Sequence, residues 1–179
     1  MGKDPIRINI SNLAEEITEL SSGDKILLNG IIYTARDAAH EKIISALDNN
    51  ETPPFPIKNS VIYYVGPSPA RPDQVIGSAG PTTSYRMDSF TPQLMDQGLK
   101  ATIGKGPRSP KVIEAIQRNR GAYFAAIGGA AALISDSIKS SETIAYPELG
   151  PEAVRKLEVD DFPAIVAIDS KGNDLYTSH

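Results

Sequence analysis

The chain of 179 residues contains no cysteine and only two histidines, His40 and His179. Without cysteine, the chain can form no disulfide, thiol nucleophile, cysteine-ligated zinc site or iron–sulfur cluster held by its own thiolates. A two-histidine metal site is disfavoured as well, because His179 is the last residue of the sequence. Any metal chemistry would therefore have to come from another chain.

Charge and hydrophobicity exclude further classes of partner. The net charge of −4 provides no overall attraction to nucleic acid or to anionic membranes. The longest weakly polar run, residues 122–134, is shorter than the roughly 20 residues needed to span a bilayer. The N-terminal sequence MGKDPIRINI lacks the apolar core of a signal peptide. We therefore expect a cytoplasmic protein that binds neither nucleic acid nor membrane.

Charge is nevertheless distributed unevenly along the chain. The segment from Lys105 to Arg120 carries five basic residues and one acidic residue, Glu114. A local excess of positive charge makes a site for a small anion possible in this segment. Residues 136–179 are acidic by comparison.

The composition is that of a folded domain with many turns. Hydrophobic residues make up 40% of the chain and charged residues 22%, both close to the globular average. The 14 glycines and 14 prolines favour tight turns and argue against a coiled coil or a simple helical bundle. Neither a repeat nor a low-complexity linker interrupts the chain, so a single domain over residues 1–179 is expected.

The hydrophobic pattern alternates between strands and helices, which is typical of an α/β fold. It predicts an edge strand at residues 6–10 and further strands at 25–33, 61–65, 101–103, 122–127, 144–146, 157–159 and 164–168. It predicts helices beginning near residues 11, 37, 91, 110 and 130.

Three loops share one pattern, in which a cation follows the end of an apolar segment in a tight turn. The cations are Arg36, Arg86 and Lys105. If these side chains converge, they would hold a small dianion, because guanidinium groups match carboxylates bidentately and an ammonium group adds a point charge. The alternative is three separate surface cations near helix starts, and the spacing leaves both possibilities open.

The loop from Gly77 to Arg86 places glycines before a predicted helix start, where free backbone amides attract anions. It has neither the Gly-Lys-Ser/Thr ending of a Walker A motif nor a GxGxxG arrangement, which disfavours a nucleotide. The hydroxyl groups of Thr82, Thr83 and Ser84 stand where they could cap the helix.

Residues near these loops allow a structural and a functional interpretation. His40 lies one turn into the helix after Arg36 and is either a structural histidine or a catalytic one. Asp37 either caps that helix or orients Arg36. Gly128 and Gly129 either permit close packing of a helix on the sheet or present backbone amides to a ligand.

Taken together, these motifs resemble the β subunit of the iron–sulfur fumarate hydratases and of their L-tartrate dehydratase relatives. The resemblance runs in order over about residues 5–176. The motifs that carry it are TARDAAH at 34–40, GPTTSYRMD at 80–88, IGKG at 103–106, GGAAAL at 128–133, ELG at 148–150 and DFP at 161–163.

The resemblance implies a swivelling three-layer β/β/α domain, with mixed sheets and helices on one side. It also implies an α subunit as partner, whose cysteines hold a [4Fe-4S] cluster with one iron free to bind substrate. The expected assembly is a heterotetramer of two α and two β chains. This chain itself would contribute no metal ligand.

The same resemblance assigns roles to residues of this chain. A small dicarboxylate substrate would be bound by Arg36, Arg86, Lys105 and Thr83. Lys105 would also take part in catalysis, and Thr82 would transfer the proton. A threonine hydroxyl is a very weak acid, so this role requires desolvation or a partner carboxylate.

The activity implied is that of a hydro-lyase, the reversible hydration of fumarate to L-malate at a site shared with the α subunit. Within the family, an L(+)-tartrate dehydratase β subunit is the alternative. A noncatalytic swivelling module that binds dicarboxylates is an alternative of another class.

Overall fold

The computed structural model describes residues 3–127 and 131–177. Its strands are β1 (Ile6–Asn9), β2 (Lys25–Thr34), β3 (Val61–Tyr63), β4 (Ala101–Gly104), β5 (Ala122–Ala126), β6 (Ile138–Ala145) and β7 (Val154–Ile168). Its helices are α1 (Leu13–Glu16), α2 (Asp37–Asp48), α3 (Thr91–Asp96), α4 (Pro110–Asn119) and α5 (Ala131–Ser137). Short 3-10 helices are η1 (Ile10–Asn12), η2 (Ile17–Glu19), η3 (Ser84–Met87) and η4 (Pro147–Glu152).

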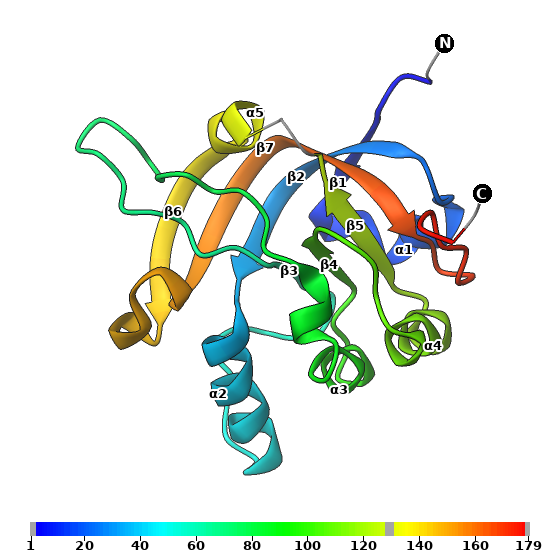
Figure 1. Ribbon diagram of the computed structural model, residues 1–179, viewed down its shortest axis with the longest axis horizontal. Coiled ribbons are helices and arrows are strands. Elements are labelled where there is room, and N and C mark those ends of the chain that lie inside the picture. The colour runs from blue at the N-terminus through cyan, green and yellow to red at the C-terminus, as the bar shows by residue number, and fades with distance from the viewer. Residues whose placement is uncertain (1–2, 128–130, 178–179) are drawn as a thin grey trace.

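The strands of the described chain form one mixed sheet in the order β1-β2-β3-β4-β5-β7-β6. Strands β1 to β5 run parallel to their neighbours, whereas β7 is antiparallel to β2, β5 and β6. Because β2 pairs with both β3 and β7, strands β2, β3, β4, β5 and β7 close into a ring, with β1 and β6 attached outside it (Figure 1).

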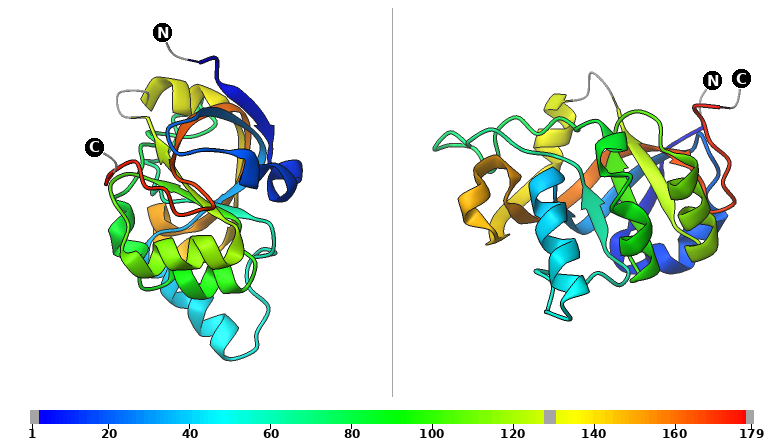
Figure 2. Two further views of the ribbon diagram at one scale, coloured as in Figure 1. Left: turned by 90° about the vertical axis from the view of Figure 1, so that its right-hand side faces the viewer. Right: turned by 60° about the horizontal axis from the view of Figure 1, so that its bottom comes forward.

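Two hydrophobic clusters make up the core. One joins the strands to one another and to α1, and it includes Leu28, Tyr63 and Phe162. The other lies between the sheet and α2, α3 and α4, which stand side by side along one side of the molecule (Figure 2). Neighbouring side chains of a strand point to opposite faces, so Tyr63 belongs to the first cluster and Tyr64 to the second.

The predicted α/β class and the edge position of β1 are confirmed, and the helices begin close to the expected residues. The swivelling three-layer description stays a prediction, as does the single-domain organisation. Within the described residues, no helix combines the length and the apolar character needed to cross a membrane.

The prediction of two separate strands at 157–159 and 164–168 is wrong, because residues 154–168 form the single strand β7. Asp161 adopts the left-handed region, with φ of 58°, and the strand continues through this irregularity. The Asn29 side chain of β2 accepts a hydrogen bond from the Asp161 amide (2.9 Å) and donates one to the Asp161 carboxylate (3.1 Å). These bonds satisfy the polar groups of the bulge, so pairing with β2 resumes at Phe162 and Pro163.

The strand predicted at 144–146 is also longer than expected and spans Ile138–Ala145. The first half of β7 pairs with the whole of this segment. The paired residues extend from Ile138 opposite Val159 to Ala145 opposite Val154. Pairing with β7 therefore keeps extended a segment whose own hydrophobic alternation is weak.

Candidate active site

The three cation loops lie at one edge of the sheet. Arg36 follows β2 by two residues, Lys105 directly follows β4, and Arg86 belongs to η3, whose first residue Ser84 is hydrogen-bonded to the Lys105 carbonyl (2.9 Å). Strands β2, β3 and β4 are parallel neighbours, so their carboxyl ends share that edge. Ligand sites of α/β proteins are commonly found at such an edge.

Asp37 brings the two arginines together. Its Oδ2 atom accepts a hydrogen bond from Arg86 Nε at 3.1 Å, and its Oδ1 atom lies 3.9 Å from Arg36 Nε. The side chains of Arg36, Asp37 and Arg86 are 24%, 32% and 45% exposed. One carboxylate thus holds the Arg86 guanidinium by a hydrogen bond and lies at ion-pair distance from that of Arg36, without a hydrogen bond to it, and both groups keep N–H donors for a ligand. The sequence allowed Asp37 either to cap the helix or to orient Arg36. The contacts fit the second interpretation and extend it to Arg86.

A second group of contacts joins Thr82 to Lys105. The segment 82–84 inserts between the ends of β3 and β4, where the Thr82 amide donates to the Tyr64 carbonyl (2.7 Å). The Lys105 amide donates to the Thr82 carbonyl (3.4 Å), and Thr83 pairs with Lys105 in parallel. Thr82, Thr83 and Lys105 are therefore neighbours at the strand ends, with Thr82 and Thr83 half-buried and Lys105 exposed.

The hydroxyl groups of this segment do not cap η3. Thr83 occupies the N-cap position, but its side chain makes no capping hydrogen bond. The Ser84 hydroxyl instead contacts the Tyr123 hydroxyl at 2.7 Å. Within the described residues, the Thr82 hydroxyl makes no hydrogen bond, so no carboxylate of this chain assists it. The capping interpretation is wrong for Thr83 and Ser84, and the Thr82 hydroxyl is left available to a ligand.

His40 lies beneath Arg36 and is completely buried. Its Nδ1 atom is 2.8 Å from the Arg36 carbonyl oxygen, to which it donates, and its ring packs near Tyr64 and Phe90. Burial lowers the pKa of His40 to about 4, and the positive charge of Arg108 acts in the same direction. The ring is therefore neutral near pH 7 and is placed to fix the Arg36 backbone, while Nε2 has no partner among the described residues.

A buried polar network centred on Arg108 was not predicted from the sequence. The Arg108 side chain has no exposed surface, and its Nε donates to Asp88 Oδ1 at 2.7 Å. Its remaining donors reach the hydroxyls of Thr102 (2.9 Å), Thr91 (2.8 Å) and Tyr64 (3.1 Å). Asp88 also accepts a hydrogen bond from the backbone amide of residue 109.

This network ties η3 to the loop that follows β4. The Arg108 guanidinium lies over the ring of Tyr123, 4.8 Å from its centroid, and the Tyr123 hydroxyl contacts Ser84 (2.7 Å) and the Gly106 carbonyl (2.8 Å). The contacts therefore fix the segment 82–86 relative to Lys105. The sequence shows Arg108 only as one member of a basic segment, and its burial comes from residues distant in the chain.

The basic segment from Lys105 to Arg120 is not one anion site. Arg108 is buried in the network, whereas Arg118 pairs with Asp96 on the surface at 2.8 Å. Of these three cations, Lys105 alone lies at the strand ends with Thr82, so the small-anion site that the segment makes possible stays a prediction for Lys105. Gly128 and Gly129 lie outside the described residues.

Across residues 3–127 and 131–177, no group of three or more histidine, aspartate or glutamate side chains is placed to hold a metal ion. Together with the absence of cysteine from the sequence, this means that the described part of the chain does not fit an iron–sulfur cluster.

Residues 2–179 match a family model described as Fumarase C-terminus. The chain is 43% identical over 177 residues to "Fumarate hydratase class I, aerobic" of Escherichia coli K12, covering 96% of this chain and 32% of that protein. It is 43% identical over 170 residues to "Fumarate hydratase 2" of Leishmania major, covering 94% of this chain and 30% of that protein. The chain thus spans about a third of the length of these relatives.

A third relative is close to this chain in length. The chain is 42% identical over 168 residues to the "Putative L(+)-tartrate dehydratase subunit beta" of Methanocaldococcus jannaschii. The match covers 90% of this chain and 86% of that protein.

Proposed function

The chain belongs to the Fumarase C-terminus family, and we propose that it is the β subunit of a two-subunit fumarate hydratase. The reaction is the reversible hydration of fumarate to L-malate. One observation carries the proposal: two guanidinium groups converge on Asp37 at the sheet edge where Thr82 and Lys105 are neighbours. A small dicarboxylate matches this set of cations, and the relatives named for their activity are hydratases and a dehydratase.

Coverage of the relatives supports a two-chain enzyme. The chain corresponds to about a third of each fumarate hydratase but to most of a protein named as a β subunit. We infer that an α subunit supplies the remainder, in a cytoplasmic heterotetramer of two α and two β chains. The [4Fe-4S] cluster implied by the resemblance belongs to that partner, since this chain has no cysteine.

Within this model, Arg36 and Arg86 bind one carboxylate of the substrate and Lys105 binds the other, with Thr83 beside it. Guanidinium groups held by Asp37 are preorganised, so little side-chain freedom is lost when substrate binds. The Nε of Arg36 is buried at 3.9 Å from Asp37 Oδ1 and makes no hydrogen bond, so binding of a carboxylate rests on the Nη donors of this group.

Thr82 carries the proton in this model. In the direction from malate to fumarate, its oxygen, as the alkoxide, accepts a proton from the carbon next to the one that loses hydroxide, and the hydroxyl so formed passes that proton to the departing hydroxide, which gives water and regenerates the alkoxide. In the hydration direction, it returns that proton. Negative charge on the threonine oxygen is stabilised by the ammonium group of the neighbouring Lys105, and this attraction becomes stronger when the partner covers the site and excludes water.

The β subunit of an L(+)-tartrate dehydratase is the second candidate. It is favoured by the match to the Methanocaldococcus jannaschii protein, whose length this chain nearly shares. Both reactions remove water from a hydroxydicarboxylate, so the cations described above serve either one.

Kinetics of the coexpressed pair test the proposal. The pair is assayed on malate, fumarate and L-tartrate, with cluster content measured in every preparation. Arg86→Lys keeps the charge but loses the guanidinium fork, so kcat/KM for malate should fall about 30- to 150-fold. Arg118→Lys is the matched control, because Arg118 of α4 pairs with Asp96 of α3, away from the strand ends.

Preference for tartrate over malate would replace the first candidate with the second. Dicarboxylate binding by a pair with full cluster content and no turnover of any of the three substrates would support a noncatalytic module and contradict both.

A further inference from the structure

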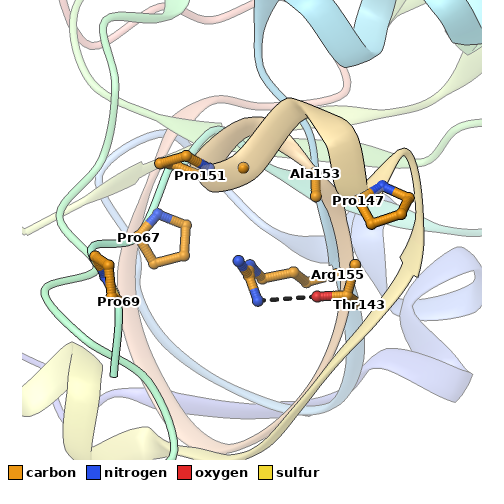
Figure 3. Close-up of a pocket in the computed structure, with 8 residues that line it drawn as sticks. Pro67, Pro69, Thr143, Pro147, Pro151, Ala153 and Arg155 are labelled. Atoms are coloured by element: carbon orange, nitrogen blue, oxygen red, sulfur yellow. Dashed lines mark hydrogen bonds between the residues drawn. The ribbon is translucent and has the colours of Figure 1, made fainter. Parts of the chain in front are cut away.

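A separate pocket lies beside the candidate active site. It has a volume of about 320 Å³ and lies between the loop after β3 and the turn that joins β6 to β7 (Figure 3). Four of its eight lining residues are prolines: Pro67, Pro69, Pro147 and Pro151. Its size is at the lower end of the range for small-molecule sites. Arg36, Arg86 and Lys105 do not line it.

One cation, Arg155, points into this pocket (Figure 3). Its Nη1 atom donates to the Thr143 hydroxyl at 3.0 Å, whereas its Nε atom is buried and has no hydrogen-bond partner. No acidic side chain lines the pocket, and Arg155 forms no ion pair within the described residues. A guanidinium group carries five N–H donors, so most of its capacity to bind an anion is unused.

The position of Arg155 is fixed by the sheet. It lies near the start of β7, directly opposite Thr143 of β6. Its backbone amide donates to the hydroxyl of the fully buried Thr34 in β2 at 3.0 Å. The guanidinium is thus anchored at its backbone and at Nη1, which reduces the entropy lost when a ligand is bound.

The pocket is adjacent to Arg36 but distinct from the site of Arg36. A Cβ atom at Gly66, which precedes Pro67, would lie 2.9 Å from Arg36 Nη1 and 3.3 Å from the Pro151 carbonyl oxygen, so the Arg36 guanidinium lies next to the Pro151 end of the pocket wall. The cation that lines the pocket itself is Arg155 and not Arg36.

The chemistry of the wall indicates the kind of anion. A proline has no backbone N–H, so the four prolines offer a ligand only apolar surface and carbonyl oxygens. One guanidinium balances one negative charge, and the second negative charge of a phosphate dianion or of a dicarboxylate would be left uncompensated in this pocket. The pocket therefore suits an anion with a single carboxylate and a short apolar body.

We propose that the Arg155 pocket is a second anion site, which binds the carboxylate of a small monocarboxylic acid with its apolar part against the prolines. This site goes beyond the hydratase function and does not depend on it. Its ligand differs from the dicarboxylate substrate in charge and in polarity.

The test is a titration of the full chain with sodium butyrate, followed by two-dimensional NMR of the backbone amides and the arginine Nε–H groups. Saturable shifts are expected at Thr143, Val154 and Arg155. Butanamide, the neutral analogue, should produce no such shifts at the same concentration. This comparison uses the unaltered chain, so it tests the proposal whichever variant folds. Equal shifts with butanamide, or none with butyrate, would overturn the proposal.

Variants then locate the site. Arg155→Met should weaken butyrate binding by about tenfold or more, the loss expected for a hydrogen bond to a charged group. Arg7→Met is the matched control, because Arg7 is an exposed arginine that pairs with Asp161. Binding that survives Arg155→Met but is lost in Arg36→Met would place butyrate in the candidate active site and refute the second site.

Discussion

Substitution of Arg108 should destabilise the fold strongly, because its charge is fully buried and fully paired. Arg108→Met keeps the apolar stem but removes the ion pair to Asp88 at 2.7 Å and the hydrogen bonds to three hydroxyls. Removing one partner of a buried ion pair typically costs about 3–5 kcal/mol, since the other charge remains buried. For a chain of this size, the melting temperature should fall by about 6–20 °C.

Urea denaturation followed by circular dichroism measures this loss of stability. The matched control is Arg118→Met. The ion pair of Arg118 with Asp96 has a similar N···O distance of 2.8 Å, but about half of each side chain is exposed, so the unfolding midpoint should stay close to that of the unaltered chain. The double variant with Asp88→Leu should lose less than the sum of the single variants, because no charge is stranded. A loss below about 1 kcal/mol for Arg108→Met would refute the assignment of a paired buried charge.

Three further outcomes are expected. Gly66→Ala should raise KM for malate while the chain stays folded, because the new Cβ would displace the Arg36 guanidinium. Gly80→Ala is the control, since its Cβ would meet no atom within 4 Å, and this variant should behave as the unaltered enzyme. Because burial lowers the pKa of His40 to about 4, the unfolded chain binds a proton that the folded chain does not, so stability should fall by about 2 kcal/mol between pH 7.5 and 5.0. That pH dependence should largely disappear in His40→Asn, and an unchanged slope would contradict it. Thr82→Val should abolish kcat with little effect on KM or melting temperature, since the hydroxyl makes no hydrogen bond within the described chain, and a normal kcat would remove Thr82 from the mechanism.

Local pattern was sufficient to predict most of the elements and the loops that carry the cations. Alternating isoleucines indicate β1, and the continuous apolar runs indicate β2 and β3. Cations that follow parallel strands reach the same edge whatever their distance in sequence, but the spacing left their convergence open, and only the family resemblance assigned Arg36 and Lys105 to one site. The arrangement of Arg36 and Arg86 around Asp37 depends on side-chain geometry and could not be assigned.

Two features could not be predicted, because they depend on contacts between distant residues. The continuity of β7 through Asp161 relies on the side chain of Asn29, which is 132 residues away. The burial of Arg108 relies on Asp88 and Thr91, which lie at the junction of η3 and α3, and on Tyr64, which follows β3. A charged residue in a basic segment is exposed in most proteins, and only the fold identifies the exception.

The most direct test of the account is the rate of fumarate hydration by purified α subunit, by this chain and by the two mixed, with cluster content held equal. The account predicts turnover by the mixture, none by either chain alone, and a loss of that turnover when the added chain carries Thr82→Val. A cluster-loaded α subunit that hydrates fumarate at the same rate with and without this chain would contradict the proposal that Arg36, Thr82, Arg86 and Lys105 complete the active site.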